Sequence, residues 1–178
     1  MIGIIVAEEK ELNAVKNIMS NIEEINIYEK TFYKGIIENK NVVVVKSNVG
    51  KVNSARVCQI LIDKFNPKLV INVGTAGSVD NSLDIGDVVV ADRLVQYDFD
   101  VTPFGRKLGE IENIGGYIEV DKKLLDLFND IDVTIGTIAT GDKFIVNIEE
   151  KNNIRNRCDF ITSVFAFLEY KVFTVIKN

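Results

Sequence analysis

The sequence predicts a three-layer α/β fold, and three observations support this. Short apolar stretches rich in β-branched residues, such as Ile2–Ala7, Val42–Val45 and Leu69–Val73, have the composition of buried strands. Helical periodicity separates them, so that the elements alternate as β-α-β-β-α-β-β-α-β, with helices available for both faces of a sheet. The chain has 178 residues and a hydrophobic fraction of 47%, enough for a sizeable core. We therefore expect a single domain over residues 1–178.

The charge balance and the lack of histidine limit the function classes. The formal net charge is −5 and no basic patch is visible, which disfavours a nucleic-acid partner. Without histidine there is no Ser-His-Asp or Cys-His catalysis and no histidine metal site, so carboxylates must carry any proton transfer. Cys58 and Cys158 show no metal or redox spacing, and no apolar run reaches the roughly 20 residues that cross a bilayer. We expect a soluble cytoplasmic protein without a metal or a membrane partner.

The first strand, Ile2–Ala7, leads into a helix that opens with acidic residues. Glu8, Glu9 and Glu11 suit the positive end of a helix dipole, which is the ordinary reason for their presence. The apolar face of this helix is formed by Leu12, Val15, Ile18 and Met19. Ligands of open α/β sheets bind beyond the carboxyl ends of the strands. One of the three glutamates is therefore a candidate general base.

A hairpin and a second helix follow. Thr31–Glu38 and Asn41–Lys46 have the composition of paired strands, and Val52–Phe65 has helical periodicity. Between them, Gly50-Lys51 invites comparison with a P-loop. Val45 stands where that motif needs its first glycine and Val52 replaces its Ser or Thr, so we reject this interpretation.

The central strand ends in small residues. After the buried strand Leu69–Val73, the stretch Gly74–Ser78 is expected to break the strand. Glycine permits positive φ and lets a ligand approach the main chain closely. A loop of this kind at a strand end is a candidate ligand site.

The second half of the chain continues the alternation with one long irregular segment. Residues 96–116 show no clear period, and a loop this long inside a compact domain is usually functional or packed against a partner. The other expected elements are strands at Val88–Val95, Val133–Ala139 and Val172–Ile176, and helices at Asp121–Asn129 and Ile148–Arg155.

Several stretches together resemble the 5′-methylthioadenosine/S-adenosylhomocysteine nucleosidases, members of the nucleoside phosphorylase superfamily. The matching motifs, in the family's order, are Ile2–Leu12, Ser47–Asn53, Ile71–Gly77, Ile85–Val90, Asp100–Gly105 and Thr140–Ile145. The resemblance covers about residues 1–158. It implies a nucleoside phosphorylase-like fold with a central mixed β-sheet, and hydrolysis of these nucleosides to adenine and a 5′-thioribose without a cofactor.

The resemblance also implies roles for individual residues. Glu11 aligns with the carboxylate that activates the attacking water. Ala76 and Gly77 align with the lining of the sugar and base pocket. Phe144 is expected to stack on the adenine and the Ile145 backbone to hydrogen-bond its edge. Val101 and Phe104 align with the loop that crosses to a partner subunit and closes the pocket over the 5′-substituent, so a homodimer is implied.

The last twenty residues, 159–178, depart from the family. The family has a Glu-Met-Glu stretch that holds the ribose and a later Ser-Asp pair whose aspartate protonates the purine, and neither is found here. Glu169 has the wrong neighbours for the ribose role. The family's last strand and C-terminal helix are also not found, so we expect a C-terminally truncated fold with impaired activity. The aromatic-rich segment Phe165–Ile176 is expected to cover part of the exposed sheet.

Two alternatives remain open. A purine nucleoside phosphorylase would need arginines near the glycine loops to hold phosphate, whereas the first loop carries three glutamates. The other alternative is a non-catalytic fragment that only binds nucleoside or dimerises. If the chain is active, Asp142 is the first residue to test as the missing acid.

Overall fold

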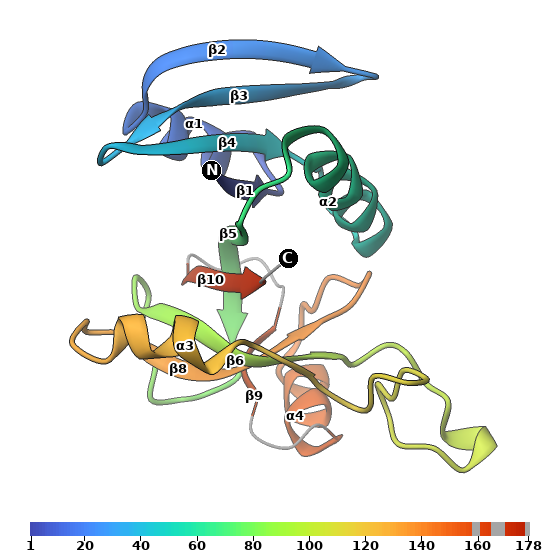
Figure 1. Ribbon diagram of the computed structural model, residues 1–178. Coiled ribbons are helices and arrows are strands. Elements are labelled where there is room, and N and C mark those ends of the chain that lie inside the picture. The colour runs from blue at the N-terminus through green and yellow to red at the C-terminus, as the bar shows by residue number, and fades with distance from the viewer. Residues whose placement is uncertain (158–160, 165–169, 177–178) are drawn as a thin grey trace. The chain divides into compact units, whose positions relative to one another are not determined.

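The computed structural model describes residues 1–157, 161–164 and 170–176. These residues divide into two compact units (Figure 1). The first contains Met1–Gly74 and the end of the last strand, and the second contains Thr75–Phe173. Whether the two units form the single domain predicted for residues 1–178 stays a prediction.

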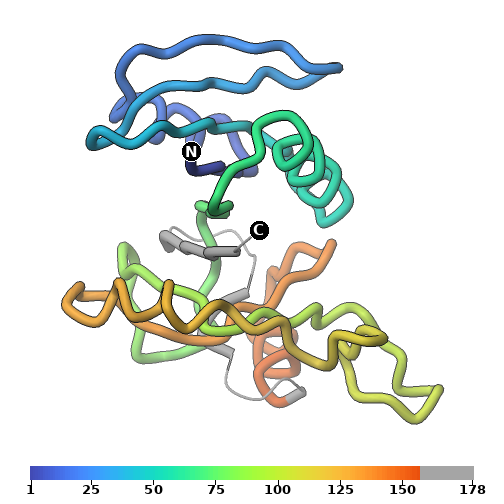
Figure 2. The backbone as a smooth tube through the Cα atoms, in the orientation of Figure 1, coloured from blue at the N-terminus to red at the C-terminus, as the bar shows by residue number. Residues whose placement is uncertain are grey.

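Mixed strand pairing organises the first unit. Strand β1 (Ile2–Val6) is parallel both to β4 (Lys40–Lys46) and to β5 (Leu69–Ser78). On its other side β4 is antiparallel to β3 (Lys30–Ile37), and β3 is antiparallel to β2 (Ser20–Ile27). The backbone trace shows the predicted hairpin, β3 and β4, and the preceding strand β2 that the sequence pattern missed (Figure 2).

Helices cover both faces of this sheet, as the three-layer prediction requires. On one face, Leu12 and Val15 of α1 (Glu9–Asn17) cluster with Ile4 and Val6. On the other, α2 (Lys51–Phe65) packs Val57 and Leu61 on alternate residues of β1 and β4. Residues that alternate along a strand point to opposite faces, so a continuous apolar strand needs a helix on each side.

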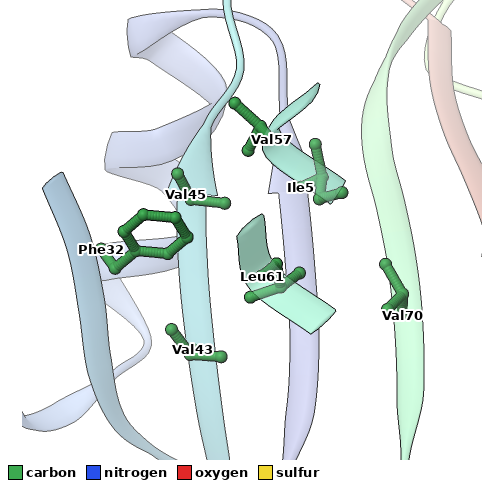
Figure 3. Packing of buried hydrophobic residues seen from close by; sticks show 7 residues of the cluster. All are labelled: Ile5, Phe32, Val43, Val45, Val57, Leu61 and Val70. Carbon is green, nitrogen blue, oxygen red and sulfur yellow. The ribbon is translucent and has the colours of Figure 1, made fainter. Parts of the chain in front are cut away.

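Figure 3 shows how tightly α2 is fitted to the sheet. Val57 and Leu61 lie over Ile5, Val43 and Val45, with Phe32 beside them. Strand β1 has no side chain at Gly3, and a Cβ added there would stand 2.7 Å from Leu61 Cδ2. Even a methyl group at position 3 would therefore force the buried Leu61 side chain to shift.

The second unit is also a mixed α/β structure. Strand β6 (Val88–Gln96) is parallel to β8 (Thr134–Thr140) and β10 (Tyr170–Ile176), and antiparallel to β7 (Ile118–Glu119). Strand β9 (Ile161–Val164) is parallel to β8 and antiparallel to the end of β5. The helical elements are α3 (Lys122–Leu125), the 3₁₀ turns η1 (Thr102–Phe104) and η2 (Asp126–Phe128), and α4 (Ile148–Arg157). The mixed α/β fold class is confirmed.

The predicted strand break at Gly74–Ser78 is wrong. Strand β5 continues through these residues to Ser78, and the φ angles of Gly74 and Gly77 lie outside the left-handed region. Small residues here permit close packing on an extended backbone rather than a turn. The prediction that residues 96–116 are irregular is confirmed, because between the end of β6 and residue 116 the backbone contains η1, turns and one isolated bridge, Ile111 to Gly115 (Figure 2). The expected cover by the side chains of Phe165–Ile176 lies outside the described residues.

Candidate active site

The start of α1 fixes the carboxylate of Glu11. Its Oε2 accepts hydrogen bonds from the backbone N–H groups of Ala7, at 2.8 Å, and Glu8, at 2.9 Å. The side chain thus folds back over the end of β1, in the manner of a capping box. Two donors on one oxygen hold the carboxylate in one orientation and satisfy N–H groups that the helix leaves without partners.

The other carboxylate oxygen lies against Gly74. An added Cβ at Gly74 would stand 2.9 Å from Glu11 Oε1. Residues 63 positions apart in the chain are thereby brought into contact, since β1 and β5 are neighbours in the sheet. Gly74 matters here for its missing side chain and not for its backbone angles.

The structure also separates Glu11 from its two neighbours. Glu9 pairs with Lys46 at the end of β4. Glu8 stands at the N-cap position of α1, where its side chain is exposed. Of the three glutamates that sequence reasoning could not fully distinguish, Glu11 alone has its carboxylate laid over the backbone of the central strand.

A buried serine braces the same strand ends. Ser47 is fully buried, and its hydroxyl has a single proton to share between the carbonyl oxygens of Asn48, at 2.7 Å, and Val6, at 3.2 Å. The Ser47 N–H also donates to Val6 O, at 2.8 Å. These bonds fix the end of β1 immediately before the residues whose N–H groups hold Glu11.

We expect Gly74→Ala to lower turnover while leaving the fold nearly as stable. The new methyl group would displace Glu11 Oε1 and distort the two hydrogen bonds on Oε2, whereas the buried cores of the unit would stay unchanged. A displacement of about 1 Å at a reacting group costs on the order of 10²-fold in rate. The measurements are the adenine release that the family resemblance implies, the thermal midpoint, and the amide chemical shifts of Ala7 and Glu8.

Gly116→Ala is the matched control, because no atom lies within 4 Å of the Cβ that it would add. Unchanged turnover and unchanged Ala7 and Glu8 shifts in Gly74→Ala would show that the contact with Glu11 is unimportant.

In the second unit, Ala76 and Gly77 are both buried. Ala76 packs with Val89, Ala91 and Ile138. Gly77 is paired with Val164 of β9, and Val164 is paired with Ala139 at the end of β8. With strands about 4.8 Å apart, Gly77 therefore lies about 10 Å from the start of the Thr140–Ile145 segment.

That segment presents its two predicted binding residues differently. The Phe144 side chain is 50% exposed, whereas the Ile145 side chain is buried in a cluster with Val79, Val95 and Tyr97. The buried Ile145 side chain anchors the segment, and the binding role of its backbone stays a prediction.

The predicted closing loop is built around η1. Asp100 Oδ1 accepts from the N–H and the hydroxyl of Thr102, which starts the turn, and the Phe104 N–H donates to Val101 O at 3.0 Å. Phe104 is 83% exposed and Val101 is partly buried. A phenylalanine this exposed is available to a partner surface.

In residues 1–157, 161–164 and 170–176, no group of three or more acidic or cysteine side chains is placed to hold a metal ion. Among the helices of the same residues, none combines the length and the apolar character needed to cross a membrane.

Comparison with known proteins gives consistent matches. A family model described as the phosphorylase superfamily matches residues 1–161. A 5′-methylthioadenosine/S-adenosylhomocysteine nucleosidase of Staphylococcus haemolyticus is 37% identical over 163 residues, which are 88% of this chain and 72% of that protein.

Solved structures agree with this. S-adenosylhomocysteine nucleosidase from Streptococcus pyogenes, in complex with 5-methylthiotubericidin, has a TM-score of 0.87 and 32% identity, covering 97% of this chain and 80% of that one. The S. pneumoniae 5′-methylthioadenosine/S-adenosylhomocysteine nucleosidase with the transition-state inhibitor MT-ImmA has a TM-score of 0.88 and 32% identity, covering 97% and 83%.

Proposed function

Because this chain belongs to the 5′-methylthioadenosine/S-adenosylhomocysteine nucleosidases of the phosphorylase superfamily, we propose that it hydrolyses the N-glycosidic bond of these nucleosides to adenine and the 5′-thioribose. The observation that carries the proposal is the Glu11 carboxylate, held by two N–H groups and laid against Gly74. The relatives solved with methylthio-nucleoside analogues support the substrate class.

The chemistry requires a base, and Glu11 is suited to that role. As the N-glycosidic bond breaks, positive charge develops on the ribosyl ring, and a water molecule must lose a proton as it attacks. A carboxylate supplies both the base and a negative charge that stabilises the cationic ring. Orientation by the Ala7 and Glu8 N–H groups limits the freedom that Glu11 would otherwise lose in the transition state.

The remaining roles are proposed from the family match. Ala76 and Gly77 line the sugar and base region, Phe144 stacks on the adenine, and the Ile145 backbone hydrogen-bonds the adenine edge. The half-exposed ring of Phe144 and the anchored side chain of Ile145 support this assignment.

We further propose a cytoplasmic homodimer. Val101 and Phe104 of one subunit would close the partner's site over the 5′-substituent. The high exposure of Phe104 on a loop without regular structure supports this.

Hydrolysis is favoured over phosphorolysis by the ion pairing of the one arginine that precedes Gly74 in the sequence. The sequence has one arginine before Gly74, namely Arg56. Its guanidinium forms a two-pronged ion pair with Glu29, with one N–O distance of 2.8 Å, and this pairing lowers the pKa of Glu29 to about 2. Phosphate recognition relies on such bidentate arginines, and here the guanidinium fork already holds a carboxylate.

We expect adenine release from 5′-methylthioadenosine to be independent of inorganic phosphate. The measurement is product analysis with the purified chain, with and without phosphate, which separates free 5-methylthioribose from its 1-phosphate. A phosphate requirement and formation of the 1-phosphate would establish a phosphorylase instead. Adenine binding without any turnover would identify a non-catalytic fragment.

A further inference from the structure

A buried tyrosine ties the end of β6 to the segment that carries Phe144 and Ile145. Tyr97 directly follows β6 and is only 8% exposed. Its backbone N–H donates to Thr140 O at 3.1 Å. Its hydroxyl donates to Lys143 O at 3.0 Å. Tyr97 thus holds the Thr140–Ile145 segment at two points, three residues apart.

The ring of Tyr97 also occupies the space beside Gly141. A Cβ at Gly141 would stand 2.5 Å from Tyr97 Cζ and 2.8 Å from its hydroxyl oxygen. The ring is buried and has no room to withdraw, unlike the end of an exposed side chain. Glycine at position 141 is therefore required for the tyrosine to reach Lys143 O.

Asp98, the residue after Tyr97, adds a third hydrogen bond to the segment. Asp98 Oδ2 accepts a hydrogen bond from the Asp142 N–H at 2.8 Å. Lys143 in turn pairs with Glu150 of α4. Residues 140–143 are thus each held by a defined contact, and Phe144 and Ile145 follow immediately.

We propose that Tyr97 and Asp98 are positioning residues that hold the Thr140–Ile145 segment in the conformation that binds adenine. They touch the segment through its backbone and not the base itself. The proposal rests on the proposed function, because it takes Phe144 and Ile145 as the adenine-binding residues. It assigns to this pair the task of keeping the Phe144 ring and the Ile145 backbone in place before the ligand arrives.

The hydroxyl of Tyr97 can donate its hydrogen bond to Lys143 O throughout the neutral pH range. Burial, with the nearby carboxylates of Asp98, Glu150 and Asp142, raises the pKa of Tyr97 to about 12. The phenol therefore stays protonated and remains a hydrogen-bond donor to Lys143 O.

Loss of one of these hydrogen bonds should weaken adenine binding. When only part of the population holds the binding-competent conformation, the apparent dissociation constant rises in inverse proportion to that fraction. One neutral hydrogen bond changes such an equilibrium by roughly 3- to 10-fold. We expect Tyr97→Phe to weaken adenine binding by up to that factor, which is reached when the competent conformation becomes the minor one. Phenylalanine keeps the ring beside Gly141 and removes only the hydroxyl.

Asp98 offers a matched pair of variants. Asp98→Ala removes the acceptor of the Asp142 N–H, whereas Asp98→Asn keeps a side-chain oxygen at the same place. We expect Asp98→Ala to weaken adenine binding and Asp98→Asn to retain most of it. This rescue would not follow from a general loss of packing. Tyr28→Phe is the surface control, since Tyr28 is 73% exposed and lies in the other unit.

The test is calorimetric titration of the full 178-residue chain and these variants with adenine, together with the amide chemical shifts of residues 142–145. Weaker binding in Tyr97→Phe and Asp98→Ala, with shifted amides and rescue by Asp98→Asn, supports the proposal. Binding and amide shifts equal to those of the unmodified chain overturn it and leave the nucleosidase proposal intact. Failure of the unmodified chain to bind adenine overturns both. If Tyr97→Phe does not fold, the Asp98 pair decides the question.

Discussion

Replacing Glu11 by glutamine is expected to lower the rate of adenine release by about 10²–10⁴-fold, the usual contribution of a general base. Glutamine has the same shape as glutamate and keeps a side-chain oxygen that can accept from the Ala7 and Glu8 N–H groups. It cannot take a proton from water. The expected loss is therefore in turnover, with the thermal midpoint nearly unchanged, and it is measured as adenine released from 5′-methylthioadenosine.

Glu9→Gln is the control for this prediction. Glu9 lies two residues away on the same helical turn, and its carboxylate pairs with Lys46 at the surface. Removing that charge should change turnover little, because exposed ion pairs contribute little and the three atoms nearest to a Cβ at Gly74 all belong to Glu11. Equal turnover in Glu11→Gln and the unmodified chain would assign the water-activating role to another group.

The second large effect concerns the unmodified 178-residue chain, whose turnover is expected to lie well below the roughly 1–10³ per second of typical enzymes. Adenine leaves poorly as an anion and needs a proton. Residues 159–178 contain neither the Glu-Met-Glu stretch nor the Ser-Asp pair to which the family resemblance assigns the ribose contact and the acid. Loss of a general acid costs about 10²–10⁴-fold in rate, and loss of the ribose contact should add to this.

Asp142 provides the decisive variant for this second prediction. It is the acidic residue of the Thr140–Ile145 segment, and its N–H donates to Asp98. Asp142→Asn leaves that backbone bond available and removes the proton-donating side chain. If the unmodified chain turns over at typical enzyme rates and Asp142→Asn loses them, then Asp142 is the acid and the expectation of impaired activity is wrong. Slow turnover that Asp142→Asn leaves unchanged would support impairment.

Much of the fold could be predicted because the strongest signals are local. Val42–Val45 and Leu69–Val73 are apolar on both faces, which requires a strand covered on both sides. The hairpin and the two helices of the first unit appear where periodicity and turn residues indicate them. Strand β2 was missed because most of its side chains are exposed, and so its sequence carries little alternation. Its conformation depends on backbone hydrogen bonds to β3, which no local pattern reports.

By itself, the sequence of this protein determined most of the order of strands and helices (strand β2 excepted), the family to which the chain belongs, and the identity of Glu11 as the candidate base. Only the tertiary structure decided which contacts give these residues their setting. Gly74 lies against the Glu11 carboxylate because β1 and β5 are neighbours in the sheet. The Tyr97 hydroxyl reaches Lys143 O because β6 and β8 are neighbours. The spacing of 63 residues in the first case and 46 in the second leaves no trace in any helical or strand period. Such contacts arise only when the sheet places separate strand ends side by side.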